Sequence, residues 1–379
     1  MKKVLALFLA LSMAICICAC GKKEEVSGDI PQFDGLKYEE TVKTEFATEF
    51  KIYRYQGGYS YITINNGDNI MVVPEGKNVP EGLEKDVVVL KQPIDRVYLP
   101  ATAVMAHFNA MDALGNVAYS GLEPGEWSTE EANKAMEEGN IVYAGHYSAP
   151  DYEILLHGNC DLAIESTMIY HTPEVKEKLE ELGIPVMVER STYEDHPLGR
   201  TEWVKLFGEI IGKADAAAAA YDEQAEIIHS LGSQPNTGKT VAFFYVNSRG
   251  NVVTYAGEGY IPSMIELAGG VYALKDLEAS SKLSSINMSM EEFYSMAADA
   301  DIIIYNSSIA SELYTMEQFY DLSNVLSSFK ASKNGEVWCT SKSMYQEVDK
   351  MGSIIEDMNK IITGTAGDGE SLNYIHKLK

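Results

Sequence analysis

Polar and aromatic side chains stand directly after several apolar runs that are typical of buried β-strands. Arg190 and Arg249 follow the runs that end at Val188 and Val246. A guanidinium group binds a carboxylate or a catecholate through paired hydrogen bonds, and an aromatic ring offers a flat molecule a surface on which to stack. If the two arginines lie in opposite lobes, both can reach one anionic ligand. The competing interpretation of each is an arginine in a surface ion pair.

The same position, at the end of an apolar run, selects the other candidate ligand residues. In open parallel sheets, ligands bind outside the carboxyl ends of the strands. The candidates are Thr102, His146, Tyr147, Glu165, Ser166, Thr167, Glu189, Arg190, Tyr193, Asn247, Arg249, Tyr260 and Asn306. A lone histidine such as His146 is more often held in a loop by a hydrogen bond than used as a metal ligand. We therefore predict no metal site formed by the protein itself.

Motifs of common hydrolases and zinc sites do not occur in the sequence after Cys20. It holds no His-Glu-x-x-His, Gly-x-Ser-x-Gly or Cys-x-x-Cys. Gly238-Lys239-Thr240 resembles the end of a phosphate-binding loop, but Ser233 stands where that loop requires glycine. We expect no enzymatic activity, and a hydrolase whose triad assembles only in space is the alternative.

The candidates need two sheets to position them. From Asp95 onward, short apolar runs alternate with segments of helical spacing, which predicts an α/β protein with two Rossmann-like lobes and mainly parallel sheets. Residues 200–231 are rich in Ala, Glu, Lys and Leu and predict a single long spanning α-helix between the lobes. Residues 51–73 predict a β-rich N-terminal extension with a hairpin turn at Asn66-Gly67. The predicted domains are 38–199 for the N-terminal lobe with its extension, 200–231 for the spanning helix and 232–379 for the C-terminal lobe, with a ligand cleft between the lobes.

The first twenty residues have the pattern of an exported protein. Lys2 and Lys3 precede an apolar run of 14 residues, 4–17, which is too short to span a bilayer as a helix and is typical of a signal peptide. The following Ile17-Cys18-Ala19-Cys20 resembles the lipobox of bacterial lipoproteins. That resemblance implies a signal peptide over 1–19, lipidation of Cys20, and a flexible spacer over 20–37. The mature chain would then be anchored in the lipid bilayer on the outer face of the cytoplasmic membrane.

Composition and charge limit the partners. The chain has 379 residues, of which 46% are hydrophobic, enough for two lobes with a large core. The net charge of −26 repels polyanions, so a nucleic-acid partner is excluded. Cys160 and Cys339 lie in apolar runs assigned to different lobes, and two buried unpaired thiols are the favoured interpretation.

A resemblance to a known family covers residues 95–362. Cys160-Asp161-Leu162-Ala163-Ile164-Glu165, Gly199-Arg200-Thr201-Glu202-Trp203 and Ala298-Asp299-Ala300-Asp301-Ile302-Ile303-Ile304 resemble class III solute-binding proteins of ABC transporters, the Fe/B12 periplasmic-binding family. The resemblance implies a monomer that captures a ferric siderophore, haem or corrinoid in the cleft and delivers it to a membrane permease. It also implies no intrinsic cofactor, since the metal arrives as part of the ligand. A surface adhesion or sensor module with the same fold is a further alternative.

Overall fold

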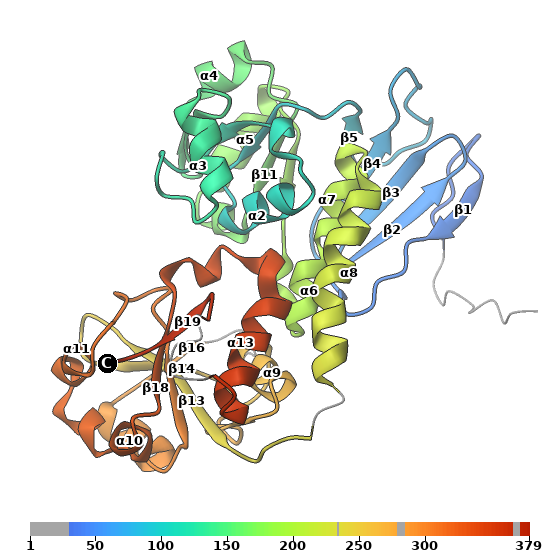
Figure 1. Ribbon diagram of the computed structural model, residues 1–379. Helices are drawn as coiled ribbons and strands as arrows, with labels where there is room; N and C mark the ends of the chain where they lie inside the picture. Colours follow the sequence, from blue (N-terminus) through green and yellow to red (C-terminus); the bar gives the residue numbers. More distant parts are fainter. Residues whose placement is uncertain (1–29, 233–234, 279–284, 367–371) are drawn as a thin grey trace, which may run out of the picture. The chain divides into compact units, whose positions relative to one another are not determined.

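The computed structural model describes residues 30–232, 235–278, 285–366 and 372–379 (Figure 1). The predicted signal peptide and Cys20 lie outside the described residues. All elements named below belong to one unit, Phe33–Lys379.

A five-stranded sheet forms the N-terminal extension. Its strands, in spatial order, are β1 (Tyr38–Thr41), β2 (Phe50–Tyr55), β3 (Tyr59–Ile64), β4 (Asn69–Val73) and β5 (Val88–Lys91), antiparallel except for the parallel pair β4–β5. Asn66 adopts a positive φ of 50°, and the N–H of Gly67 donates to the carbonyl of Ile64 at 3.0 Å, so the predicted hairpin turn is confirmed.

The first lobe is built on a parallel sheet. Its order is β12-β11-β6-β7-β8, formed by β6 (Val97–Leu99), β7 (Val117–Ser120), β8 (Val142–Tyr143), β11 (Leu162–Glu165) and β12 (Val186–Val188). The helices are α2 (Thr102–Ala110), α3 (Glu130–Glu137), α4 (Tyr152–His157) and α5 (Pro173–Glu181), with the short 3₁₀ helices η1 (Leu114–Asn116), η2 (Thr167–His171) and η3 (Ser191–Tyr193). A small ribbon pairs β9 (Gly145–His146) with β10 (Ala149–Pro150).

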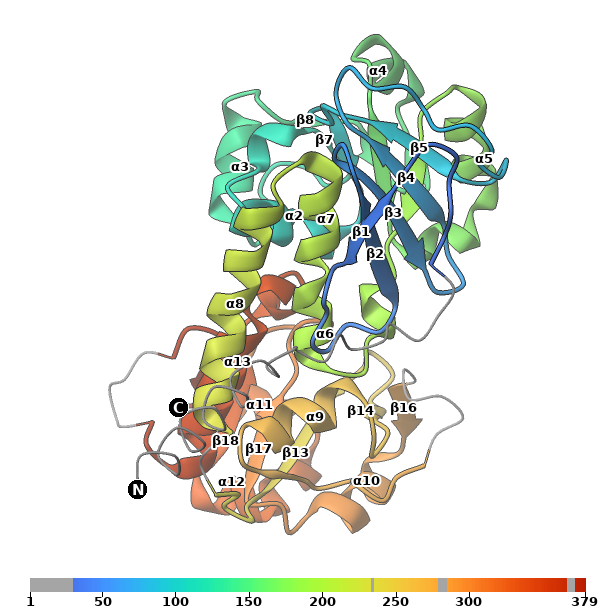
Figure 2. The same cartoon turned by 90° about the vertical axis from the view of Figure 1, so that its right-hand side faces the viewer.

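Three helices replace the predicted single spanning helix. They are α6 (Pro197–Glu202), α7 (Val204–Ile211) and α8 (Ala214–Leu231). The prediction of one continuous helix over 200–231 was wrong because Gly212, at φ 75° and ψ 24°, ends α7 in the left-handed conformation, and α8 then packs along α7. Helix α8 runs on toward the second lobe, where it packs on α13 (Met351–Thr363), and α6 also contacts α13 (Figures 1 and 2).

The second lobe contains a mixed sheet rather than a purely parallel one. The order is β16-β14-β13-β17-β18-β19, with β15 also paired to β13; the strands are β13 (Thr240–Val246), β14 (Val252–Tyr255), β15 (Val271–Tyr272), β16 (Ser285–Met288), β17 (Ile302–Tyr305), β18 (Val337–Thr340) and β19 (Ile375–Lys377). β15, β13, β17 and β18 run parallel, and β14, β16 and β19 are antiparallel. The remaining helices are α9 (Tyr260–Leu267), α10 (Met290–Ala297), α11 (Met316–Leu322) and α12 (Lys330–Asn334), with the 3₁₀ helices η4 (Asn324–Ser328), η5 (Lys342–Tyr345) and η6 (Val348–Lys350).

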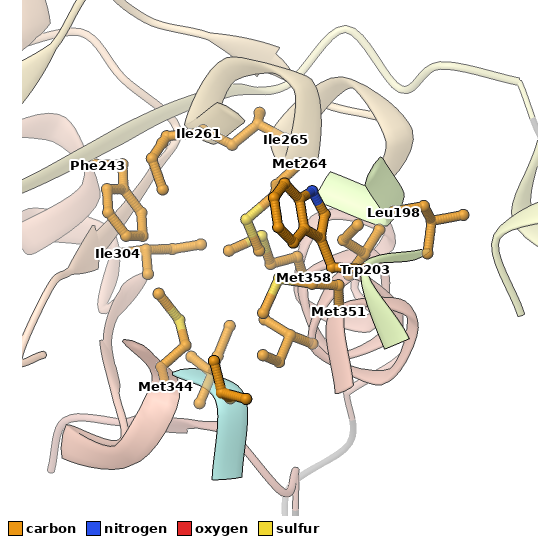
Figure 3. Packing of buried hydrophobic residues seen from close by; sticks show 14 of the residues in the cluster. Leu198, Trp203, Phe243, Ile261, Met264, Ile265, Ile304, Met344, Met351 and Met358 are labelled. Carbon is orange, nitrogen blue, oxygen red and sulfur yellow. The ribbon is translucent and has the colours of Figure 1, made fainter. Parts of the chain in front are cut away.

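One apolar core runs through the extension, the linking helices and the second lobe. Trp203, which follows α6, is fully buried and lies beside Met264 of α9 and Met351 and Met358 of α13 (Figure 3). A second core covers the other face of the first sheet, where Tyr98 and Ala163 alternate with strand neighbours that belong to the main core. The linking helices are therefore packed into both lobes and do not hang between them.

One smaller prediction has a clear outcome. Cys160 and Cys339 are buried and unpaired, as favoured from the sequence. Among the residues that the structure describes, none of the helices combines the length and apolarity needed to cross a membrane.

Candidate functional site

A cavity of about 750 Å³ lies between the lobes. Three groups of residues line it. The first lobe contributes Thr102, Ala103, Ser166, Thr167 and Met168; the segment that leaves the first lobe contributes Glu189, Ser191, Thr192, Tyr193 and Arg200; the second lobe contributes Tyr255, Glu258, Tyr260, Ile261, Pro262, Asn306, Ser308, Ile309, Met344, Tyr345 and Val348. Most of these positions follow the carboxyl end of a strand or begin a helix, as expected for ligand sites in open α/β sheets.

Two helices begin at this cavity, one from each lobe. Thr102 is the first residue of α2 and Tyr260 the first of α9, and both line the cavity. The preceding residues, Ala101 and Gly259, give these helices no side-chain cap. Their first N–H groups therefore lack the side-chain acceptor that usually satisfies them, and the positive ends of the two helix dipoles lie at the cavity wall.

Arg200 brings a formal positive charge to the same wall. Its guanidinium lies 3.7 Å from the ring centre of Tyr260, across the boundary between the lobes. It donates hydrogen bonds to the carbonyls of Thr192 at 3.1 Å and Glu194 at 3.4 Å, and burial lowers its pKa. These contacts hold the group in place on one side and leave it beside the cavity on the other.

Glu189 is the acidic counterpart within the first-lobe wall. Its side chain is 3% exposed, and a carboxylate oxygen accepts a hydrogen bond from the N–H of Ser191 at 2.8 Å. Burial raises its pKa, whereas the hydrogen bond and the charges of Arg200 and Arg190 act in the opposite direction. The cavity thus combines a cation with a carboxylate that is less easily ionised than usual.

The second lobe supplies phenols and an amide. Asn306 donates through Nδ2 to the hydroxyl of Tyr255 at 3.1 Å, and its Oδ1 accepts from the N–H of Ser308 at 3.0 Å. Burial is the main cause that raises the pKa of Tyr255 and of Tyr260, so both phenols stay protonated at neutral pH. Neutral phenols of this kind donate hydrogen bonds or stack, and they carry no charge.

Several large apolar side chains at the cavity are exposed. The exposed fractions are 47% for Met168, 67% for Ile309 and 46% for Tyr345. Exposed apolar groups gathered at one concave site are a common sign of ligand binding. The arrangement suits a molecule with a large apolar body and an anionic group.

The structure brings together seven of the residues predicted from strand ends. Those that line the cavity are Thr102, Ser166, Thr167, Glu189, Tyr193, Tyr260 and Asn306. The others do not line it: His146, Tyr147, Glu165, Arg190, Asn247 and Arg249. The paired use of Arg190 and Arg249 on one ligand therefore finds no support in the geometry.

The arginines miss the cavity for local reasons. Arg249 is exposed in the turn of the β13–β14 hairpin, where its N–H donates to Oδ1 of Asn247 at 2.9 Å. Because β14 returns antiparallel, the end of β13 is a hairpin tip and not a loop over the cleft. Arg190 is 7% exposed and lies behind the cavity wall, with its guanidinium 4.0 Å from the ring centre of Tyr193.

Glu165 lies beneath the cavity floor formed by Ser166 and Thr167. It is fully buried, and neither carboxylate oxygen has a hydrogen-bond partner in the described structure. Burial raises its pKa to about 8, so it is mostly protonated at neutral pH. His146 and Tyr147 belong instead to the β9–β10 ribbon, where the two rings lie 4.2 Å apart.

Sequence reasoning did not select Arg200, Tyr255 or Tyr345. Arg200 is inside a helix and not at a strand end, so the rule used for the other residues passed over it. Its signal was present in the segment Gly199-Arg200-Thr201-Glu202-Trp203, which follows the last strand of the first lobe by a few residues. Within the described residues, there is no cluster of three or more metal-ligating side chains.

Comparisons with solved structures define the class of fold. A periplasmic binding protein from Veillonella parvula superposes with a TM-score of 0.58 at 14% identity, over 76% of this chain and 96% of that one. A periplasmic haem-binding protein from Pseudomonas aeruginosa gives 0.56 at 15% identity, over 75% and 98%. A Saccharomonospora viridis protein of an ABC-type Fe³⁺-hydroxamate transport system gives 0.53 at 18% identity, over 73% and 94%. The chain therefore has the two-lobed fold of periplasmic solute-binding proteins.

Relatives in sequence are lipoproteins. Two uncharacterized lipoproteins of Methanocaldococcus jannaschii are 26% identical over 338 residues and 23% identical over 351 residues. The first alignment covers 87% of this chain and 78% of the relative, and the second covers 88% and 86%. No protein-family model matches the sequence.

Proposed function

We propose that this protein is the lipid-anchored solute receptor of an ABC importer and that its cargo is an anionic metal chelate or corrinoid. The observation that carries the proposal is the cavity between the lobes, with Arg200 and two uncapped helix N-termini at its wall. Ferric siderophores of the catecholate or carboxylate type, haem and corrinoids all combine a large body with carboxylate, catecholate or phosphate groups. The class of cargo follows from that shared chemistry, and its individual member is what the experiment below determines.

The size and lining of the cavity support this class. A volume of about 750 Å³ is within the range of roughly 300–1,000 Å³ that is usual for small-molecule sites. Met168, Ile309 and Tyr345 offer apolar surface to the body of the ligand, while the positive groups face its anionic part. Cargo binding in this arrangement needs no covalent step and no resident cofactor, since the metal belongs to the cargo.

Anchoring and delivery complete the proposal. Lipid on Cys20 would hold the protein on the outer face of the cytoplasmic membrane, and two acyl chains suffice for stable attachment. Both relatives in sequence are named as lipoproteins, which supports this placement. A permease in that membrane is the partner to which a receptor of this fold would pass its cargo.

A ligand panel tests the function. The purified protein is titrated with haemin, cyanocobalamin and a ferric catecholate siderophore while absorbance and tryptophan emission are recorded. We expect one of the three to saturate at one molecule per chain, with a shifted absorption band or quenched emission. Absence of saturable binding to all three would contradict the proposed cargo class.

A further inference from the structure

The segment 188–203 carries much of the cavity wall and is attached to the N-terminal sheet. Glu189, Ser191, Thr192, Tyr193 and Arg200 all line the cavity and belong to this segment. The chain runs through it on leaving β12 for the linking helices. Loops with few partners are usually the mobile parts of a binding site, but this one has many.

The first attachment uses two fully buried carboxylates. Glu202 accepts hydrogen bonds of 2.8–3.0 Å from the N–H groups of Glu45, Phe46 and Ala47. Glu194 accepts from the N–H groups of Thr48 at 2.9 Å and Glu49 at 3.0 Å. Buried carboxylates satisfied in this way are costly to release, because the charge would lose its donors.

Aromatic contacts reinforce this attachment. Glu194 also accepts from the indole N–H of Trp203 at 3.0 Å, so it joins residues 45–49, here called the strap, to the core. The ring of Phe46 stacks on the imidazole of His196 at 3.8 Å between ring centres and 6° between planes. The strap 45–49 therefore lies along the segment through several consecutive residues.

The second attachment is the β3–β4 hairpin, which reaches the residues next to the cavity. Oδ2 of Asp68 accepts a hydrogen bond of 2.9 Å from the N–H of Val188, on the free edge of strand β12. A methyl group added at Gly67 would lie 3.2 Å from Cδ of Arg190. Arg190 in turn stacks on Tyr193, and Tyr193 lines the cavity.

We propose that the N-terminal sheet clamps the segment 188–203 and thereby positions Tyr193 and Arg200 for ligand binding. The clamp consists of the strap 45–49 with Glu194 and Glu202, and the hairpin residues Gly67 and Asp68 with Val188 and Arg190. Asp68 and Arg190 act as positioning residues, since neither lines the cavity. Arg190 contacts Tyr193, which is part of the wall, and Asp68 binds Val188, the residue before Glu189 of the wall. The link to affinity rests on the proposed binding function, but the effect on the segment does not.

The variant that opens the hairpin attachment is Asp68→Ala. It leaves the N–H of Val188 without its acceptor and also removes the 3.7 Å ion pair with Lys176. Asp68→Asn removes the same charge but keeps an oxygen that accepts from Val188, so it separates the hydrogen bond from the ion pair. Gly115→Ala is the matched control, because a methyl group there meets nothing within 4 Å.

The primary readout needs no ligand. Amide hydrogen exchange of peptides from 189–200 is measured in the purified ligand-free protein. We expect exchange about tenfold faster in Asp68→Ala than in the wild type, and near-normal exchange in Asp68→Asn and Gly115→Ala. Unchanged exchange in Asp68→Ala overturns the clamp.

The second readout connects the clamp with the cavity. Affinity is measured for whichever of haemin, cyanocobalamin and the ferric catecholate the wild type binds, and we expect about a tenfold loss in Asp68→Ala with recovery in Asp68→Asn. Faster exchange with unchanged affinity overturns the positioning role. If the wild type binds none of the three probes, the proposed function fails, while the exchange measurement still decides whether the clamp exists.

A second variant covers the case in which Asp68→Ala does not fold. Gly67→Ala introduces a methyl group 2.9 Å from Cγ2 of Ile64 and 3.2 Å from Cδ of Arg190, so the arginine has to move. We expect faster exchange around Tyr193 than in Gly115→Ala, and equal exchange in the two variants counts against the clamp.

Discussion

At the scale of single residues, Arg200 has the most direct consequence for binding. It is the arginine that lines the cavity, and it contacts residues from both lobes through Tyr260 and the Thr192 carbonyl. A charged hydrogen bond is worth roughly 1.5–3 kcal/mol. Arg200→Ala is therefore expected to weaken binding of an anionic ligand by about ten- to a hundredfold, measured by titration with the probe that the wild type binds.

Arg249→Ala is the control for this prediction, since it removes the same charge from an exposed hairpin turn outside the cavity. Its affinity should equal that of the wild type. Equal losses from both variants would mean that net charge, and not the position of Arg200, governs binding.

Glu165 gives a prediction about pH. Its folded pKa is about 8 and the ordinary value is 4.5, so folding favours the protonated form. Its contribution to stability is fully present below pH 4.5 and is lost as pH rises toward 8. We expect Glu165→Gln to increase the free energy of unfolding by roughly 2–4 kcal/mol at pH 8 and by little at pH 5, measured by urea denaturation. A gain that is the same at both pH values would show that Glu165 is ionised in the folded protein.

Selecting the residues that follow predicted strands identified part of the cavity wall and missed the rest. It found Glu189, Tyr193 and Asn306, because the polarity of a parallel sheet fixes which end of a strand faces the cleft. It failed for Arg249, because the return direction of β14 depends on a turn and not on the apolar run before it. Arg200 was beyond the rule altogether, since its place at the cavity comes from how a helix packs between two lobes.

At the scale of elements, the close packing of α7 on α8 was the feature that the sequence concealed. Composition predicted helix correctly for most of 200–231, but the turn at Gly212 depends on a single left-handed residue. This stretch contains two glycines, Gly208 and Gly212. Gly208 lies where α7 and α8 touch, because a methyl group there would lie 2.4 Å from Cβ of Ala217.

Gly208→Ala therefore tests the helix pair through the sign of its effect. In an isolated helix this substitution stabilises by about 1 kcal/mol. Here we expect a net loss of about 1–2 kcal/mol in the free energy of unfolding, because overpacking typically costs 1–3 kcal/mol. Gly232→Ala, where the nearest atom is at an ordinary 3.6 Å, should be neutral or slightly stabilising. A stabilised Gly208→Ala protein would be incompatible with the packed pair.

At the scale of the whole molecule, several contacts connect the lobes besides the chain itself. Oε1 of Gln346 accepts from the N–H of Ser128 at 2.8 Å, and the hydroxyl of Thr201 donates to the carbonyl of Val348 at 2.8 Å. Helix α8 is joined to α13 through Gln224 and the N–H of Ser353 at 3.2 Å. These ties favour a small closing movement on ligand binding over a large hinge rotation.

The proposed membrane attachment is a separate property of the whole protein and would depend on lipidation of Cys20. We expect Cys20→Ala to abolish incorporation of labelled palmitate in growing cells, because the lipobox cysteine is the acceptor of the lipid. Cys18→Ala should keep the label, since position 18 belongs to the predicted signal peptide, which would be removed. Label retained after Cys20→Ala would refute the predicted anchor site.

In the proposed binding mode, one ligand is held by both lobes at once. The direct measurement is amide hydrogen exchange of the protein with and without the bound probe, compared for 189–200 on the first-lobe side and 255–262 on the second. We expect both segments to gain protection together at the same probe concentration. Protection confined to one segment, or absent from both despite saturable binding, would contradict a ligand site between the lobes.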